Sequence, residues 1–325
     1  MSDPGVENAA SDQTYWAFAD QCRPAQAGRP TRLGKPLPDI LCGRFRVERL
    51  LGVGGMGAVY RGRDLLREQF GDPCPVIALK TLSEEFAEHA GANALLHNEF
   101  ALTSRLHHKH VIRLFSFEID PVSERAFIVM ELLKGCTLDQ LLLRYPQGLP
   151  WAKARDVAQA LLKALAYIHR QGVIHGDIKP NNLMLGDLGI RLFDFGLGQA
   201  DVASLTGLPT LARDRFTAWT PRYAAPELLD GNPLSRATDL YAAACVIYEL
   251  CHGQHPYPGL VTQTGTTEFV PQPAKPSDMP QHIWHVLKQY LVLDPDKRLD
   301  NTEILLAAVQ TPSRLSQLVF WHRHN

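Results

Sequence analysis

The fold is decided by the stretch His175-Gly176-Asp177-Ile178-Lys179-Pro180-Asn181-Asn182, which is followed by Asp194-Phe195-Gly196. It places a carboxylate, an ammonium and an amide beside a proline-restricted turn. Asp177 is suited to accept the proton of a hydroxyl nucleophile, and Lys179 to stabilise charge on a phosphoryl group. Asn182 and the aspartate of the second motif offer the oxygen ligands that Mg²⁺ prefers. Together they predict a phosphoryl-transfer site.

A glycine-rich segment, Gly52-Val53-Gly54-Gly55-Met56-Gly57, lies upstream. Glycines let the backbone approach phosphate oxygens closely. The segment alone is also compatible with a dinucleotide-binding turn or a plain hairpin turn. A dinucleotide-binding turn needs a helix after it, whereas the following Ala58-Val59-Tyr60 is β-like. A Walker A loop would need Lys-Ser or Lys-Thr after the last glycine, and neither is present.

Lys80 ends an apolar strand that begins near Val76. Such a lysine is most often only a solvated strand end. In a phosphoryl-transfer site it would hold the α- and β-phosphates and pair with a helix glutamate. Glu99, on a helix expected within 84–106, is the candidate. A lone helix glutamate is normally at the surface, so this assignment depends on the neighbouring motifs.

Three downstream residues have a structural interpretation. Glu227, in Ala225-Pro226-Glu227, is expected to form a buried ion pair with Arg298. Asp239 begins an apolar helix and is expected to bind backbone amides of the loop 175–182, here called the catalytic loop. Each could also be an ordinary surface residue when it is taken alone.

The order of elements indicates an α+β fold, with a small β-rich part followed by a larger helical part. Strands are expected at 111–117 and 126–130, and helices at 151–170, 240–250, 283–293 and 302–309. Residues 1–41 are rich in Pro, Gly and Ala and are expected to be a flexible extension. Its one apolar cluster, Tyr15-Trp16-Ala17-Phe18, is interpreted as a short docking element.

Composition excludes several classes of protein. The 325 residues are 45% apolar and carry a formal net charge of −1, so nucleic-acid binding has no support from charge. None of the six cysteines forms a C-x-x-C pair or a zinc-like spacing. No secretory signal is visible, and the most apolar stretch, 240–251, is shorter than the roughly 20 residues that span a bilayer. We therefore expect a soluble, cytoplasmic protein without membrane insertion.

In this order, the motifs resemble the eukaryotic-type (Hanks-type) serine/threonine protein kinases of the soluble bacterial kind, over residues 45–308. The resemblance implies a bilobal protein kinase fold, with an N-lobe at 42–133 that carries one key helix and a helical C-lobe at 134–325. It implies transfer of the ATP γ-phosphoryl group to Ser or Thr hydroxyls of proteins, with autophosphorylation, and Mg²⁺ or Mn²⁺ as the metal. Some kinases of this kind accompany type VI secretion genes, so the resemblance also implies a link of this protein to type VI secretion.

The resemblance also assigns roles to individual residues. The catalytic set is Asp177 as base, Lys179, the Lys80–Glu99 pair and Thr220. The metal ligands are Asn182 and Asp194. Residues expected at the nucleotide are Leu51, Gly52, Gly54, Gly57, Val59, Ala78, Lys80, Met130, Glu131, Leu133 and Met184.

The sequence departs from the family pattern at three positions. Gly176 stands where an arginine usually precedes the catalytic aspartate, Trp219 replaces a usual glycine, and Thr103 replaces a usually larger apolar residue. Two alternatives are considered. A pseudokinase scaffold would lack Lys80 or the catalytic and metal-binding residues, and all of them are present. A small-molecule kinase of the aminoglycoside or choline type usually lacks Lys179 and the Ala-Pro-Glu motif.

Overall fold

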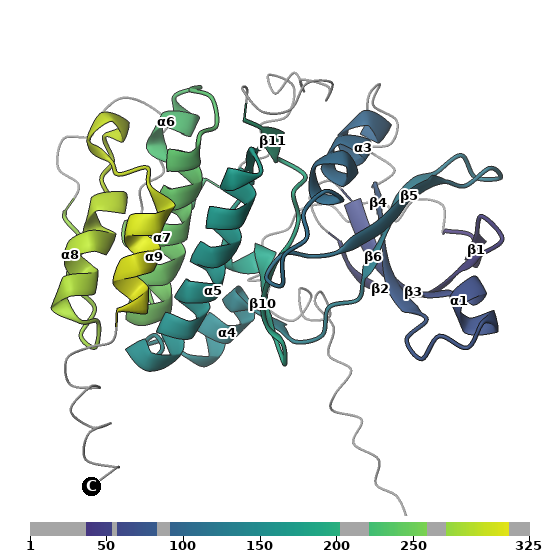
Figure 1. Cartoon of the computed structure of the whole chain (residues 1–325), viewed down its shortest axis with the longest axis horizontal. Helices are drawn as coiled ribbons and strands as arrows, with labels where there is room; N and C mark the ends of the chain where they lie inside the picture. Colours follow the sequence, from purple (N-terminus) through teal and green to yellow (C-terminus); the bar gives the residue numbers. More distant parts are fainter. Residues whose placement is uncertain (1–36, 54–56, 83–91, 202–220, 259–270, 312–325) are drawn as a thin grey trace, which may run out of the picture.

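The structure, a computed structural model, describes residues 37–53, 57–82, 92–201, 221–258 and 271–311. Within these residues the chain forms two lobes, with a sheet and helix α3 at one end and most of the helices at the other (Figure 1). The α+β, two-lobed architecture expected from the resemblance is therefore confirmed.

The N-lobe is built on a six-stranded antiparallel sheet in the order β1-β2-β3-β4-β6-β5. Its register places Gly52 opposite Val59, and Val59 opposite Lys80 on the next strand. These pairings place the start of the glycine-rich segment, Gly52, two strands away from Lys80, with Val59 between them. The strands are β1 (Ile40–Leu41), β2 (Phe45–Val53), β3 (Gly57–Asp64), β4 (Val76–Leu82), β5 (Leu114–Ile119) and β6 (Ala126–Glu131).

The two faces of this sheet pack into separate hydrophobic clusters, because side chains alternate along each strand. The inner face, with Ala78 and Met130, joins the large core that includes helix α3 (Ala92–Thr103) and the C-lobe. The other, outer face has its own small core, made of Leu41, Phe45, Ile77, Leu79, Phe127 and Val129.

A short helix, α1 (Leu65–Gln69), follows β3 and was not expected from the sequence. Asp64 caps it, since its carboxylate accepts the backbone N–H groups of Leu66 and Arg67. Arg44 in turn makes two bonds to the same carboxylate, at 2.9 and 2.6 Å. These contacts hold α1 beside the outer face of the sheet.

The C-lobe consists of helices around α7 (Arg236–His252), in which every residue from Thr238 to Cys251 is buried. A helix that is apolar all round belongs in a core. Ser235 caps its first turn, and Gly253 ends it with φ at 81°. The other helices are α4 (Leu138–Arg144), α5 (Trp151–Arg170), α6 (Pro226–Leu229), α8 (Gln281–Tyr290) and α9 (Thr302–Gln310), with 3₁₀ turns η1 (Pro180–Asn182) and η3 (Pro295–Lys297).

Short strands line the junction of the two lobes. Leu192 bridges Val111, and its backbone bonds to Ile112 and His110 at 2.9 and 2.8 Å. This segment therefore fixes the end of β10 against the N-lobe. The strands are β7 (Cys136–Thr137), β8 (Val173–Ile174), β9 (Leu183–Gly186), β10 (Gly189–Leu192) and β11 (Gln199–Ala200).

The expected ion pair between Glu227 and Arg298 is confirmed and is buried. The guanidinium reaches both carboxylate oxygens, at 2.5 and 3.0 Å, and its side chain has no exposed area. It also donates to the backbone oxygens of Val292 and Leu293 and lies 4.7 Å from the Tyr241 ring centroid. The contacts of Arg298 therefore join α6 to the segment around η3.

Most elements match the sequence expectations. The helix at 151–170 is found with the same bounds, because its apolar residues repeat with a clear helical period. The apolar helix at 240–250 is longer, at 236–252. Of the helix expected within 84–106, residues 84–91 lie outside the described residues, and α3 covers 92–103. The boundaries between extension, N-lobe and C-lobe remain predictions. No helix in the described parts of the chain is long and apolar enough to cross a bilayer.

We expect Arg298→Ala to lower the free energy of unfolding by about 3–5 kcal/mol, because it leaves the Glu227 carboxylate buried without its partner. Arg170→Ala is the matched control, since it breaks an ion pair with Glu303 in which both side chains are mostly exposed. Its cost should be at most about 1 kcal/mol. Chemical denaturation measures both. Equal losses in the two variants would contradict the role given to the buried pair.

Candidate active site

Lys80 lies between two carboxylates that come from distant parts of the chain. Its Nζ is 2.6 and 2.7 Å from the two oxygens of Glu99, on α3, and 2.7 Å from Oδ1 of Asp194. The strand β4, the helix α3 and the segment after β10 therefore meet at one ammonium group. The pairing of Lys80 with Glu99, expected from the sequence, is present.

The charges in this cluster shift one another's pKa values. Burial alone would lower the pKa of Lys80, but the charges of Asp194 and Glu99 outweigh it and the pKa is raised. Burial raises the pKa of Glu99, and the attraction of Lys80 only partly offsets it. Burial also acts against the charged form of Asp194, yet Lys80 holds the pKa of Asp194 below its ordinary value. Asp194 is thus the carboxylate that stays charged most firmly.

The catalytic loop brings three polar side chains together at η1. Lys179 Nζ lies 2.7 Å from Oδ2 of Asp177. Asn182, which is buried, donates from Nδ2 to the backbone oxygen and to Oδ2 of Asp177, at 2.8 and 3.0 Å. The carboxylate of Asp177 is therefore held in one orientation by its own loop.

Two oxygens near these groups suit a hard cation. Asn182 bonds through its nitrogen, so its Oδ1 makes no hydrogen bond to any other described residue. Asp194 uses Oδ1 for Lys80, and its Oδ2 likewise has no partner within the described part of the chain. Amide and carboxylate oxygens are the ligands that Mg²⁺ prefers. The two residues expected as metal ligands therefore fit that ion chemically.

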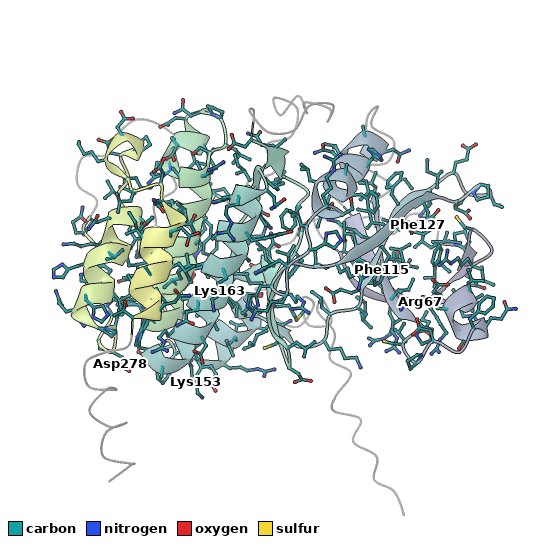
Figure 2. The ribbon with its side chains drawn as sticks, viewed as in Figure 1. Arg67, Phe115, Phe127, Lys153, Lys163 and Asp278 are labelled. Carbon is teal, nitrogen blue, oxygen red and sulfur yellow. The ribbon has the colours of Figure 1, made fainter. Side chains whose placement is uncertain are left out.

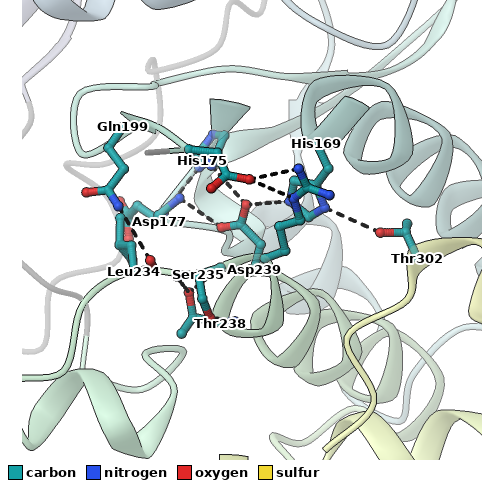
Figure 3. Close-up of polar contacts among 12 residues, drawn as sticks. His169, His175, Asp177, Gln199, Leu234, Ser235, Thr238, Asp239 and Thr302 are labelled. Atoms are coloured by element: carbon teal, nitrogen blue, oxygen red, sulfur yellow. Dashed lines mark hydrogen bonds and ion pairs between the residues drawn. The ribbon is translucent and has the colours of Figure 1, made fainter. Parts of the chain in front are cut away.

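Asp239 supports the catalytic loop from below (Figure 3). Its Oδ2 accepts the backbone N–H of His175 at 2.9 Å, and its Oδ1 accepts that of Gly176 at 2.8 Å. His169 Nε2 lies 2.9 Å from the same Oδ2, and its Nδ1 is 3.3 Å from Oγ1 of Thr302. Burial opposes the charge of Asp239, but the bond from His169 and the loop amides hold its pKa below the ordinary value. The expected amide bonds are confirmed.

His175 connects the catalytic loop with the segment that carries Asp194. Its Nδ1 accepts the backbone N–H of Asp177 at 3.2 Å, and its Nε2 lies 3.0 Å from the backbone oxygen of Phe193. Both contacts are satisfied when the proton is on Nε2, which is an inference from the bonding pattern. Burial lowers the pKa of His175, in agreement with a neutral ring. The ring also packs on Phe195, with centroids 4.5 Å apart.

The apolar residues expected around the nucleotide belong to one cluster. Val59 and Met130 line a pocket of about 20 Å³ together with Lys80, Glu99 and Asp194. A space of this size is enough for a water molecule. The residues of the large core that carry the nucleotide prediction are Leu51, Val59, Ala78, Met130, Leu133 and Met184.

Backbone geometry explains two of the glycines. A Cβ on Gly57 would lie 2.0 Å from the backbone oxygen of Thr81, so no side chain fits there. Gly176 has φ at 79°, and a Cβ there would lie 2.8 Å from the backbone oxygen of Leu197 and 2.6 Å from Leu234. The absence of the usual arginine at Gly176 therefore agrees with the local backbone.

Other expected residues are placed less completely. Glu131 donates its backbone N–H to the Arg113 oxygen at 3.0 Å, so a bond from Glu131 to a nucleotide base would come from its carbonyl. Gly52 lies in β2, while Gly54, Thr220 and Trp219 lie outside the described residues. The roles of His169 and His175 were not predicted from the sequence, because a single histidine does not indicate which distant residue it will contact.

Thr103, one of the departures from the family pattern, is buried on α3. Its hydroxyl has no hydrogen-bond partner among the described residues. It lines the 20 Å³ pocket beside Glu99 and Phe195. A water molecule in this pocket would satisfy the hydroxyl.

We expect Asp239→Asn to reduce the free energy of unfolding by about 2–3 kcal/mol at neutral pH, since an amide cannot accept from both loop N–H groups as a carboxylate does. The folded-state pKa of Asp239 is lowered. Its charge therefore stabilises the fold above the unfolded value of about 3.9, and this contribution is lost as the pH falls through the folded value. The difference in free energy of unfolding between Asp239→Asn and the parent protein should therefore become smaller as the pH is lowered from neutral to acid. Denaturation measured at a series of pH values tests this.

Asp156→Asn, at an exposed position of α5, is the control and should leave stability within about 0.5 kcal/mol of the parent. A gap for Asp239→Asn that is the same at every pH, or no larger than that of the control, would contradict the charge-based role.

Comparison with known proteins places these features in a family. A family model described as protein kinase domain matches residues 45–308. The serine/threonine-protein kinase PkaA of Streptomyces coelicolor is 32% identical over 267 residues, which are 78% of this chain and 47% of that protein. Serine/threonine-protein kinase PknA of Mycobacterium tuberculosis is 29% identical over 265 residues, 79% of this chain and 58% of that protein.

A plant protein is also similar. The putative CBL-interacting protein kinase 13 of Oryza sativa subsp. japonica is 33% identical over 223 residues, 68% of this chain and 41% of that protein. The chain thus spans only about two fifths to three fifths of the length of these relatives. Because the family model covers most of the sequence and the matching residues build the two lobes described above, this chain belongs to the protein kinase family.

Proposed function

We propose that this protein is a serine/threonine protein kinase that transfers the γ-phosphoryl group of ATP to hydroxyl groups of proteins. The observation that carries the proposal is the meeting of Lys80, Glu99 and Asp194 at one point, with His175 connecting them to the loop of Asp177. Phosphoryl transfer needs little more from a protein than positioning and charge stabilisation.

Lys80 would hold the α- and β-phosphates of ATP. Glu99, on α3, holds the ammonium through both of its carboxylate oxygens. The contact of Lys80 with Asp194 has to loosen when phosphate oxygens arrive, because the ammonium has only three N–H donors. Glu99 would keep Lys80 in place during that exchange.

Asp177 would accept the proton of the attacking hydroxyl. The new bond forms between the hydroxyl oxygen and the γ-phosphorus, the bond from that phosphorus to the β-γ bridging oxygen breaks, and ADP leaves. Lys179, 2.7 Å from Asp177, lies where it could stabilise charge on the transferred group. Asn182 donates one bond to the carboxylate of Asp177 and one to its backbone oxygen.

Mg²⁺ would be held by Oδ1 of Asn182 and by Asp194, whose lowered pKa and whose Oδ2, without a partner among the described residues, suit a cation. When bound, Mg²⁺ or Mn²⁺ neutralises charge on the phosphate oxygens. The nucleotide base would lie among the apolar residues of the cluster described above, with Glu131 and Leu133 at its polar edge. Thr220 would line the substrate site.

Several finer points are part of the proposal. Autophosphorylation is proposed on Ser204, Thr206, Thr210 or Thr217, which lie outside the described residues. Protein substrates are proposed from the family, and a cytoplasmic location from the sequence alone. The names of the relatives give no support to the link with type VI secretion, which stays a sequence-based expectation.

Asp177→Asn should lower the rate of phosphoryl transfer by about 10²–10⁴-fold, the contribution of a general base. Lys80→Met should lower it by a comparable factor by freeing the phosphates. The assay is transfer of radiolabel from ATP to a generic protein acceptor with Mg²⁺, in the full chain. Asp187→Asn, at an exposed turn position between β9 and β10, is the control and should keep parental activity. Parental activity in Asp177→Asn would refute the assignment of the base.

The acceptor can be tested on the same preparations. We expect label on serine or threonine after acid hydrolysis of the acceptor protein, because Lys179 stands two residues after Asp177 as in kinases of this specificity. Label on tyrosine, or transfer only to an amino alcohol or aminoglycoside, would favour a different acceptor class. No transfer to any acceptor, with ATP bound, would favour the pseudokinase alternative.

A further inference from the structure

A pocket of about 310 Å³ lies on the N-lobe, away from the catalytic residues. Its lining includes Phe45 and Val129 of the outer core, together with three arginines: Arg44, Arg67 and Arg113. Figure 2 labels Arg67 and Phe115, which stand beside the pocket at the end of the molecule opposite the C-lobe helices. None of the residues that line it belongs to the proposed catalytic or nucleotide-binding set.

The lining carries more positive than negative charge, because three arginines face one carboxylate, Asp64. Asp64 is fully engaged by Arg44. Arg67 uses its Nε for Asp72, at 2.7 Å, and its terminal nitrogens have no carboxylate partner in the described ranges. Arg113 is exposed, and no carboxylate among the described residues lies within ion-pairing distance of its guanidinium. The pocket therefore has spare capacity for anionic groups.

The same pocket presents an aromatic surface. Phe115 is 40% exposed, and the guanidinium carbons of Arg67 and Arg113 lie 5.4 and 5.6 Å from its ring centroid. Such contacts keep the guanidinium groups beside the ring. Phe45 and Val129 are buried and form the apolar floor of the pocket. A ligand that fits would combine aromatic side chains with carboxylates.

The chain contains such a segment. Residues 1–22 include four acidic residues and no lysine or arginine, whereas residues 23–36 include four basic residues and no acidic one. The sequence Tyr15-Trp16-Ala17-Phe18 lies between Asp12 and Asp20. This separation of charge puts the aromatic residues in an acidic setting, complementary to the pocket.

The position of the segment allows it to reach the pocket within one molecule. Arg44, which lines the pocket, follows β1 by only a few residues, and β1 is preceded by residues 37–39. Sixteen residues lie between Asp20 and Leu37, and they span at most about 55 Å when extended. As a flexible chain they would have a typical end-to-end distance of about 20–25 Å. Tethering of this kind gives an effective concentration in the millimolar range.

We propose that residues 12–20 bind in cis to the arginine-lined pocket on the outer face of the N-lobe. Tyr15, Trp16 and Phe18 pack on Phe115 and the apolar floor, and Asp12 and Asp20 pair with Arg67 and Arg113. The proposal goes beyond the proposed kinase activity and does not depend on it.

The test places a photoreactive group in the segment of the full chain, by the substitution Ala17→p-benzoylphenylalanine, which retains the three aromatic residues. After irradiation, mass spectrometry maps the residues that become crosslinked. We expect intramolecular crosslinks to peptides that contain residues 44–45, 67 and 113–116. The yield should fall at high salt, because exposed charge pairs are screened.

Arg113→Glu should reduce this yield by at least about fivefold, since it places like charges together. Lys153→Glu is the matched control: Lys153 is exposed on α5, far from the pocket (Figure 2), and the yield should not change. Arg113→Glu alters an exposed side chain, so the melting temperature should stay within a few degrees of the parent. If that variant does not fold, Asp12→Arg with Asp20→Arg provides the same test from the segment.

The charge swap is the sharpest measurement. Asp12→Arg with Asp20→Arg should lower the crosslink yield, and combining it with Arg113→Glu should restore a large part of it. Equal yields in all variants would overturn the proposal, as would crosslinks that fall mainly on the C-lobe. A crosslinked dimer whose fraction rises with protein concentration would also overturn it, because the occupant would then come from a second copy.

Discussion

One ammonium group between two carboxylates organises the space between the lobes. Lys80, Glu99 and Asp194 belong to a strand, a helix and a loop that are distant in the sequence, and their ion pairs join the three at one point. Charges removed from water are costly unless they are paired with good geometry. Charge pairing therefore adds to the shared hydrophobic core in holding the sheet, α3 and the segment after β10 in their mutual arrangement. The same requirement keeps Asp194 ionised, as a metal ligand has to be.

The C-lobe side of the site is organised by backbone bonds. Asp239 receives two loop amides, and His175 joins that loop to the segment of Asp194. Because these bonds are buried, the loop has little freedom to reorganise when a substrate binds. The N-lobe side depends on ion pairs whose partners can be exchanged for phosphate oxygens. The site thus combines a rigid half with a half that can accept a ligand.

The sequence predicts those parts of the structure that follow from a local pattern or from a known motif. It does not predict contacts that depend on how distant elements pack. Helix α5 follows from its own apolar period, and the pair of Glu227 with Arg298 followed from the order of family motifs. Helix α1 was missed because five residues are too few to show a period. The partners of Asp239 were only half predicted: its bonds to amides were, but not its contact with His169, since that contact depends on the packing of α5 against α7.

The arginine-lined pocket had no sequence signal at all. Arg67 follows β3 and Arg113 precedes β5, and they share the Phe115 ring only because of the strand order and the position of α1. The complementary charge pattern of residues 1–36 is visible in the sequence, but a pattern of charge gains meaning only when a surface is found to match it.

The central claim is that Asp194 and Asn182 hold the metal of a metal–triphosphate group beside Lys80. The most direct measurement is a crystal structure of the full chain with a non-hydrolysable ATP analogue and Mn²⁺, with anomalous scattering used to locate the metal. The account predicts an anomalous peak at about 2.0–2.2 Å from oxygens of both Asp194 and Asn182, with the phosphates in contact with Lys80. A nucleotide bound in the chain with its metal elsewhere, or phosphates remote from Lys80, would contradict it.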